Sequence, residues 1–306
     1  MSWETTLDKR IAVELPELRY VSDEPLARHT SFRIGGPAKR MAFPSRAGEA
    51  VRLLELAREC GAEPLVLGNG TNVLAPDEGL DRLVIDMSAG LTRMDDTADG
   101  DIMAECGVPL GRVAEFAKKL GLTGLEFAHG IPGTVGGAVV MNAGAYGGEM
   151  KDVVCGVLVY DPANGVRLLK EGELDFAYRR SVLSGHPDWV ALYAIFRLQH
   201  GDSEKIGTKM RDLMARRKAS QPLEFPSAGS TFKRPEGYFA GTLIEQCGLK
   251  GARVGGAEVS AKHAGFIVNT GGATCADVLA LIGKVRKTVF DATGVTLEPE
   301  VRIWKS

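Results

Sequence analysis

One segment of this sequence constrains the fold more than any other: the stretch GIPGTVGGAVVMNAGAYGGEM at residues 130–150. It holds seven glycines in 21 residues, where ordinary usage of about 7% predicts one or two. Glycine has no side chain, so such a segment can bring backbone N–H groups close to another molecule. The segment therefore predicts either tight turns in a compact sheet or a loop that binds an anion.

A second segment, LGNGTNVL at residues 67–74, begins like the phosphate-binding fingerprint of a dinucleotide-binding fold. The match fails at Val73, which stands where the third glycine belongs. The following residues are typical of a strand and a turn, whereas the fingerprint requires a helix directly after the glycine turn. A third glycine pair, Gly35-Gly36, lies in TSFRIGGPA. Together the three segments favour a pyrophosphate that is held by backbone amides from separated loops.

Composition narrows the class of protein. The 306 residues suffice for two or three compact units, and 44% hydrophobic with 25% charged residues is typical of globular proteins. A net charge of -2 gives no electrostatic support for a nucleic-acid partner. No apolar run is long enough to span a bilayer, and the polar start is not a secretory signal. The scattered cysteines predict reduced thiols in a cytoplasmic protein without a zinc site.

Hydrophobic periodicity predicts helices over residues 47–60, 108–120, 203–217 and 275–290. Thr274, with Asp277 three residues later, forms a capping-box pattern at the start of the last helix. Strands are predicted over residues 64–67, 82–87, 153–160, 189–198, 265–268 and 296–304. Helices and strands therefore alternate throughout the chain, which predicts a mixed α/β or α+β fold.

Six motifs, in their order along the chain, resemble those of the UDP-N-acetylenolpyruvoylglucosamine reductase family. They are HTSFRIGGPA (29–38), LGNGTNVL (67–74), residues 130–150, YRRS (178–181), AGSTFKRP (228–235) and LEPEVRIW (297–304). The resemblance implies an FAD-binding fold of the vanillyl-alcohol-oxidase type, with two FAD-binding subdomains at residues 1–87 and 88–200. A C-terminal α+β substrate domain would occupy residues 201–306. Because only residues 199–229 separate Leu198 from Ser230, the chain resembles the short form of the family, which lacks a tyrosine-bearing insertion.

The resemblance also implies an activity. The family reduces UDP-N-acetyl-3-O-(1-carboxyvinyl)-glucosamine to UDP-N-acetylmuramate for peptidoglycan synthesis, with non-covalent FAD and with NADPH as reductant. The residues that would line the flavin are Arg33, Ile34, Gly35, Gly36, Gly68, Asn69, Gly70, Thr71, Asn72, Val73, Gly130, Pro132, Gly133, Thr134, Gly136, Gly137, Asn142, Ala143 and Gly144.

This reaction builds negative charge on the carbon beside a carboxylate, so it requires a cation at the carboxylate and an acid near that carbon. Arg179 in YRRS is implied as the cation, because a guanidinium binds a carboxylate through two parallel hydrogen bonds. Ser230 in AGSTFKRP holds the family's proton-donor position, although a serine in a glycine-flanked turn is more often structural. Glu300 matches the catalytic glutamate of the family and lies on the charged face of the predicted last strand.

Positive side chains near the diphosphate and aromatic rings near the uracil would bind the substrate; the candidates are Tyr178, Lys218, Lys233, Arg234, Lys250 and Lys262. The sequence departs from the family pattern at His29 and Arg234, where the family has asparagine. Arg180 is expected to be solvated. Two alternatives remain open, an FAD-dependent alcohol oxidase of the same broad fold and a non-catalytic binder of flavin or UDP-sugar.

Overall fold

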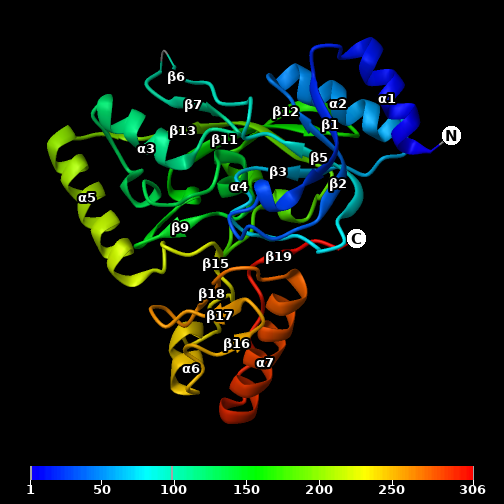
Figure 1. Ribbon diagram of the computed structural model, residues 1–306. Coiled ribbons are helices and arrows are strands. Elements are labelled where there is room, and N and C mark those ends of the chain that lie inside the picture. Colours follow the sequence, from blue (N-terminus) through cyan, green and yellow to red (C-terminus); the bar gives the residue numbers. More distant parts are fainter. Residues whose placement is uncertain (1, 98, 306) are drawn as a thin grey trace. The chain divides into compact units, whose positions relative to one another are not determined.

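The computed structural model describes residues 2–97 and 99–305, and the chain forms two compact units. Unit 1 comprises Met1–Val21, Arg40–Asn69 and Arg82–Arg216, whereas unit 2 comprises Ser22–Lys39, Gly70–Asp81 and Arg217–Ser306. Each unit is therefore assembled from three separate stretches of chain, which can be followed by colour in Figure 1. The domain boundaries that the sequence suggests after residues 87 and 200 stay a prediction.

Unit 1 contains a five-stranded sheet in the order β12-β11-β13-β7-β6. Its neighbouring strands are all antiparallel, and they are β12 (Gly165–Lys170), β11 (Val154–Asp161), β13 (Val190–Phe196), β7 (Ile102–Glu105) and β6 (Met94–Asp96). The short helix α4 (Val135–Val140) packs against β13 and β7. The glycine-rich segment therefore packs on this sheet through α4.

The other helices of this part of the chain each bury one apolar face. They are α1 (Trp3–Glu14), α2 (Ala47–Glu59), α3 (Leu110–Lys119) and α5 (Ser203–Ser220). Figure 1 shows α1 and α2 side by side. In α3 the residues Leu110, Val113, Ala114 and Ala117 recur at helical spacing and are all buried. Val113 and Ala117 belong to the apolar pattern from which the sequence predicts this helix, whereas Leu120, also part of that pattern, is exposed.

A four-stranded sheet has the order β1-β2-β5-β3, with β3 parallel to β5. Its strands are β1 (Arg19–Pro25), β2 (Pro37–Phe43), β5 (Leu80–Asp86) and β3 (Leu65–Leu67). Shorter elements complete the N-terminal two thirds of the chain. They are β8 (Leu122–Thr123) with β14 (Gln199–His200), β9 (Gly144–Ala145) with β10 (Gly148–Glu149), and 3-10 turns at Leu26–Arg28, Glu126–Ala128, Met150–Asp152, Glu171–Glu173 and Val182–Ser184.

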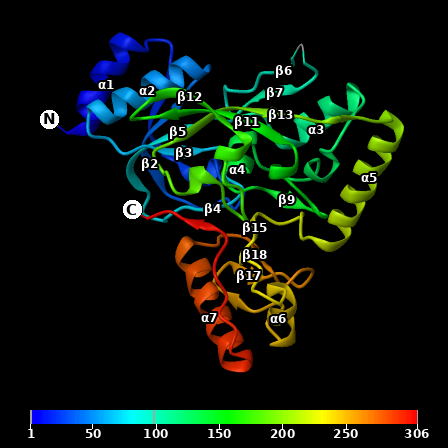
Figure 2. The same cartoon turned by 180° about the vertical axis from the view of Figure 1, so that it is seen from behind.

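Unit 2 has its own sheet and core. The sheet order is β15-β18-β17-β16, from Ser227–Ser230, Phe266–Asn269, Ala257–Val259 and Arg253–Val254. Helix α7 (Cys275–Thr293) packs against β16 and β17 and contacts α6 (Ala240–Gln246). Figure 2 shows these two helices from behind. Thr274 and Asp277 form the predicted capping box at the start of α7. The carboxylate of Asp77 also accepts the N–H groups of Cys275 and Ala276.

The predicted last strand, residues 296–304, is wrong in extent: only β19 (Arg302–Ile303) is a strand, and it lies parallel to β4 (Val73–Leu74). The chain changes partners here, because Glu300 N–H donates to Thr231 whereas Arg302 N–H donates to Asn72. One continuous ladder is therefore impossible. The other predicted strands and the four predicted helices are confirmed within a few residues. No helix in the described part of the chain is long and apolar enough to cross a membrane.

Candidate functional site

The loop after β3 presents a row of backbone donors. Within the described residues, the N–H groups of residues 68–72 donate to no protein acceptor. Gly70, in the middle of this row, is buried and has a φ of 58°. Buried N–H groups are nearly always paired in folded proteins. Five successive donors without a protein partner therefore fit an acceptor-rich ligand such as a pyrophosphate.

Glycine is required at two positions of this loop by close packing. A Cβ at Gly68 would lie 2.3 Å from Oγ1 of Thr134, and a Cβ at Gly70 would lie 2.1 Å from the carbonyl oxygen of His29. Asn69 Nδ2 donates to the carbonyl oxygen of Pro132 at 2.8 Å. Unit 1 thus brings two of the predicted cofactor segments together, residues 68–69 and residues 130–137.

The 130–150 segment contains a helix as well as turns. Thr134 is the N-cap residue of α4 and is only 2% exposed. The N–H groups of Gly133 and Thr134 have no protein acceptor in the described chain, whereas Val135 and Gly136 donate to carbonyl oxygens of residues 108 and 106. This helix start therefore adds unpaired donors near Gly68 and Asn69.

The thiol of Cys106 lies beneath this segment and is fully enclosed. Its burial raises the pKa of Cys106 to about 12. The side chain is consequently neutral at physiological pH, and its backbone carbonyl accepts the N–H of Gly136 at 2.8 Å. Cys106 therefore contributes packing and a backbone acceptor to the segment, and no nucleophile.

Sequence analysis did not single out Tyr146. It lies in the two-residue turn of the β9–β10 hairpin, with a φ of 53° beside 87° at Gly147, the pattern of a type I′ turn. The residue is 45% exposed and lines an open surface pocket of about 680 Å³ with α5 side chains that include Lys205, Lys209 and Arg216. A non-glycine residue in this backbone region is uncommon and marks candidate functional positions. The signal in the sequence was the pair Tyr146-Gly147 between two short glycine-containing runs.

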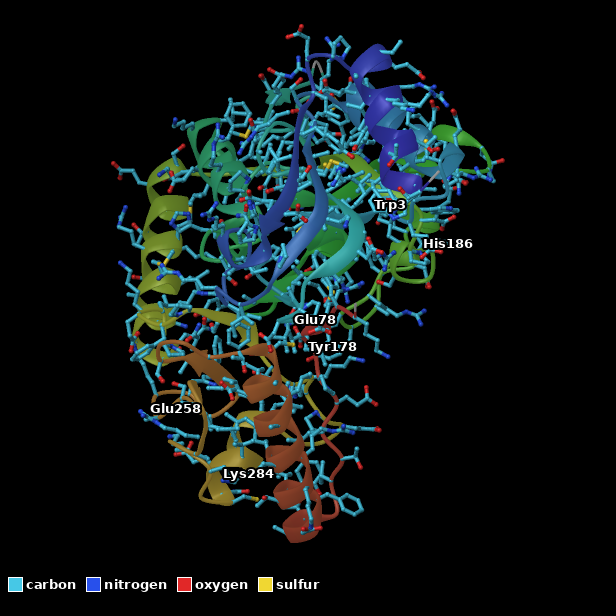
Figure 3. All side chains as sticks on the ribbon, turned by 45° about the vertical axis from the view of Figure 1, so that its right-hand side comes forward. Trp3, Glu78, Tyr178, His186, Glu258 and Lys284 are labelled. Carbon is cyan, nitrogen blue, oxygen red and sulfur yellow. The ribbon has the colours of Figure 1, made fainter. Side chains whose placement is uncertain are left out.

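Arg179 occupies a tight turn and not an extended segment. Ala177 and Arg180 exchange two backbone hydrogen bonds, of 3.0 and 3.1 Å, and Arg179 between them has a φ of 56°. Its guanidinium lies 5.1 Å from the ring of Tyr178, which is labelled in Figure 3 and 51% exposed. Arg180 is exposed and pairs with Asp175 at 2.8 Å, which confirms that it is solvated.

Ser230 ends β15 immediately after a β-bulge. Ser227 pairs with Val268 and Ser230 pairs with Phe266, so two residues of β15 oppose one residue of β18. Gly229, inside the bulge, has a φ of 74°. A bulge bends the strand and changes the direction of the side chains that follow it. The exposed Ser230 hydroxyl therefore owes its direction to the glycine that precedes it.

Hydrogen bonds in unit 2 join the predicted catalytic and cofactor residues. Ser31 Oγ donates to the carbonyl oxygen of Ser227 at 2.6 Å, and Ser31 N–H donates to Gly70. Asn72 Nδ2 donates to the carbonyl oxygen of Glu300 at 3.2 Å. Glu300 and the strand that carries Ser230 are thereby both bonded to segments that the sequence assigns to the cofactor. Arg179 belongs to unit 1.

The predicted substrate residues other than Tyr178 form ion pairs, hydrogen bonds or ring contacts with other residues of unit 2. Lys233 pairs with Glu298 at 3.1 Å, Lys250 pairs with Glu245 at 2.6 Å, and Lys262 Nζ donates to the carbonyl oxygen of Lys218. The Arg234 guanidinium lies 4.0 Å from the centre of the Phe239 ring. Exposed ion pairs contribute about 1 kcal/mol or less, so an anionic ligand can displace them.

Comparison with known proteins decides between the alternatives that the sequence left open. Residues 38–168 match the model of an FAD binding domain, and residues 221–304 match the C-terminal domain of UDP-N-acetylenolpyruvoylglucosamine reductase. The UDP-N-acetylenolpyruvoylglucosamine reductase of Caldanaerobacter subterraneus subsp. tengcongensis is 49% identical over 289 residues, which are 94% of this chain and 95% of that protein. This chain belongs to the UDP-N-acetylenolpyruvoylglucosamine reductase family.

Two further members of the family are similar to this chain over nearly its whole length. The reductase of Agathobacter rectalis is 47% identical over 309 residues, 97% of this chain and 98% of that protein. The crystal structure of the reductase from Thermus caldophilus has a TM-score of 0.80 at 36% identity, and covers 94% of this chain and 99% of that one. The predicted FAD-binding fold with a C-terminal reductase domain is therefore confirmed, whereas the assignment to the short form stays a prediction.

Proposed function

We propose that this chain reduces UDP-N-acetyl-3-O-(1-carboxyvinyl)-glucosamine to UDP-N-acetylmuramate in peptidoglycan precursor synthesis, with NADPH as reductant. The observation that carries the proposal is the identity with reductases of this family over more than nine tenths of both chains. An FAD binding domain at residues 38–168 supplies the redox group that such a reaction needs. A cytoplasmic location is consistent with the free cysteines.

The residues present fit FAD. Within unit 1, the unpaired N–H groups of Gly68 and Asn69, and those of Gly133 and Thr134, suit a pyrophosphate. Close packing at Gly68 and Gly70 leaves no room for a side chain between this backbone and its surroundings. FAD, when bound, supplies the hydride that adds to the terminal methylene carbon of the enolpyruvyl group. Binding through backbone amides agrees with non-covalent attachment.

Arg179 is assigned to the substrate carboxylate. As hydride adds to the methylene carbon, negative charge develops on the neighbouring carbon and spreads into the carboxylate. A guanidinium remains charged at every physiological pH and can bind both carboxylate oxygens at once. The left-handed backbone at Arg179 supports a functional role, because such strain persists only where the surroundings impose it.

Ser230 is assigned as the proton donor. A hydroxyl is a weak acid, so it suits a strongly basic carbon like the one that forms beside the carboxylate. Its proton completes the reduction by forming the second new C–H bond, and a proton from solvent then restores the hydroxyl. Glu300 is assigned a place near this carbon. Its carbonyl accepts from Asn72 and its N–H donates to Thr231, so its backbone is fixed on both sides.

The nucleotide part of the substrate needs cations and an aromatic surface. Lys218, Lys233, Arg234, Lys250 and Lys262 are assigned to the diphosphate, and Tyr178 is assigned to packing against the nucleotide. Arg234, which departs from the family pattern, is held over Phe239 and donates through Nε to the carbonyl oxygen of Tyr238 at 3.3 Å. Its charge is therefore held in one place, which suits a fixed phosphate better than a mobile lysine would.

Anaerobic absorbance spectroscopy of the purified protein tests the proposal. NADPH should bleach the flavin band, and the enolpyruvyl sugar should then restore it. Reduction of the flavin by an alcohol and its reoxidation by oxygen, without response to the enolpyruvyl sugar, would instead identify an oxidase. A flavin spectrum that responds to neither NADPH nor the sugar would identify a non-catalytic binder. A protein that remains colourless after incubation with excess FAD would contradict every version of the proposal.

A further inference from the structure

The carbonyl oxygen of Ala177 anchors the turn that carries Arg179. It accepts the N–H of Arg180 at 3.1 Å, which closes the turn. It also accepts a second hydrogen bond, from Nδ2 of Asn142 at 3.1 Å. A carbonyl oxygen has two lone pairs, so this acceptor is fully used. The geometry of the turn therefore depends on a side chain from a distant part of the sequence.

Asn142 uses its whole side chain inside the protein. Besides Ala177, its Nδ2 donates to Oε2 of Glu149 at 2.9 Å, and its Oδ1 accepts the N–H of Lys151 at 2.9 Å. The residue is 0% exposed and has a φ of 41°, a conformation that asparagine tolerates better than most residues. A side chain with both polar atoms engaged in this way has little left to offer a flavin.

A second contact fixes the other end of the same turn. Ser181 follows Arg180, is buried, and donates through Oγ to the carbonyl oxygen of Val140 at 3.1 Å. Val140 is the last residue of α4, and Asn142 lies two residues beyond it. Both ends of the turn are thus attached to the C-terminal end of α4, whose N-terminal end presents the unpaired donors of Gly133 and Thr134.

We propose that Asn142 is a positioning residue for Arg179: it holds the 177–180 turn on the end of α4 and so fixes the guanidinium relative to the cofactor segment. The inference rests on the proposed role of Arg179. It differs from the sequence-based expectation, which placed Asn142 among the residues that line the flavin. A small displacement of a binding group can lower a rate about a hundredfold even when the mutated residue does not touch the substrate.

Asn142→Gly is the most direct test, because glycine tolerates the positive φ and removes all three hydrogen bonds without adding charge. We expect the reoxidation of reduced flavin by the enolpyruvyl sugar to slow about 10- to 100-fold. The bound flavin per protein and the rate of reduction by NADPH should stay within about twofold of wild type. Asn164→Gly is the matched control, since Asn164 also donates from Nδ2 to a carboxylate, but on the surface.

A double mutant separates positioning from a general loss of structure. In an Arg179→Ala background, Asn142→Gly should slow reoxidation by less than about twofold further, because the group that it positions is absent. The proposal would be overturned if the effects of the two substitutions multiplied in the double mutant. It would also be overturned if Asn142→Gly lost its flavin, or if its flavin were reoxidised by the sugar at the wild-type rate. Ser181→Ala, which loosens the other end of the turn, provides a second variant if Asn142→Gly does not fold.

Limited trypsin digestion gives a readout that does not depend on activity. Release of the turn should increase cleavage after Arg179 and Arg180 at least about tenfold relative to wild type and Asn164→Gly, as measured by mass spectrometry. Unchanged cleavage would mean that Asn142 does not hold the turn. If the wild-type protein fails to reduce the enolpyruvyl sugar, the proposed function fails, and this digestion still decides whether Asn142 fixes the turn.

Discussion

The backbone N–H of Glu300 donates to the carbonyl oxygen of Thr231 at 2.8 Å, so the residue beside Ser230 is bonded directly to Glu300. Thr231 is buried, and its Oγ1 accepts the N–H of Ile267, the residue of β18 that faces the bulge. The hydroxyl thus satisfies a donor that the bulge would otherwise leave unpaired. The strand that carries Ser230 and the segment that carries Glu300 are therefore held in one hydrogen-bonded arrangement.

Ser230→Ala should separate the two half-reactions. Reduction of the flavin by NADPH should persist, whereas reoxidation by the enolpyruvyl sugar should slow by at least about a hundredfold, the usual range for loss of a general acid. Stopped-flow absorbance measures both steps. Ser227→Ala, in the same strand, serves as the control. An unaltered second step in Ser230→Ala would exclude this hydroxyl from the chemistry.

Glu300→Gln should slow the same half-reaction by at least about tenfold, because it removes the charge and keeps the shape. Flavin content should remain that of wild type, since the backbone bonds of Glu300 to Asn72 and Thr231 are unaffected. Glu298→Gln, two residues away and paired with Lys233, is the matched control. If flavin is lost in parallel with activity, Glu300 has a structural role instead.

Arg179→Lys keeps the positive charge but loses the planar pair of donors. The KM for the enolpyruvyl sugar should rise, and the rate at which the sugar reoxidises the flavin should fall. The ratio of this rate to KM should therefore fall about 10- to 100-fold, as expected for a lost hydrogen bond to a charged group. Steady-state kinetics at saturating NADPH measure the change. Arg180→Lys, in the same turn, should behave like wild type, and equal losses in the two variants would argue against a specific role for Arg179.

Gly70→Ala should abolish tight FAD binding. The added Cβ would lie 2.1 Å from the carbonyl oxygen of His29 in a backbone with a φ of 58°, so the loop must move. Gly61→Ala is a matched control, because Gly61 has a φ of 73° and open space around its Cβ position. Flavin fluorescence after gel filtration compares the two. Equal retention of flavin would show that the packing at Gly70 is unimportant for the cofactor.

The lowered pKa of Asp8 makes the stability of the folded protein depend on pH. Two hydrogen bonds from Arg40, of 2.9 and 2.7 Å, and one from Tyr20 hold the pKa of Asp8 below its usual value. A lowered folded-state pKa stabilises the protein above the unfolded value, about 4, and that stability is lost as the pH falls through the folded value. Asp8→Asn should therefore lower Tm at pH 7 and have less effect under acid conditions. Asp95→Asn, at an exposed position, is the control, and a pH-independent difference would contradict the assignment.

The sequence predicted elements well where periodicity was strong. Helix α3 buries Leu110, Val113, Ala114 and Ala117 on one face, and such spacing is visible without a structure. Helix α1 buries only Leu7 and Ile11 and shows little contrast between its faces, so the pattern did not reveal it. Helix α4 lies among glycines, which favour loops in any propensity argument, and its contacts with β13 and β7 stabilise it instead.

The candidate site was predictable from local motifs only in part. The sequence was sufficient to name the glycine segments and the positions of Arg179, Ser230 and Glu300, because each lies in a short contiguous motif. The hydrogen bonds that hold these segments could not be predicted, because they join residues far apart in sequence, such as Ser31 with Ser227 and Asn142 with Ala177. Backbone conformation could not be predicted either, because nothing in YRRS indicates that Arg179 has a left-handed backbone conformation.

The parallel pairing of β4 with β19 has a consequence for biosynthesis. The carbonyl oxygens of Asn72 and Leu74 accept from Arg302 and Trp304, which follow them by 230 residues in the chain. Asn72 and Leu74 therefore acquire this support only after residue 304 has been translated, although domains generally fold in order from the N-terminus. Nascent chains that stall before residue 300 should emerge without flavin, so cofactor capture becomes an indicator that synthesis has passed this point.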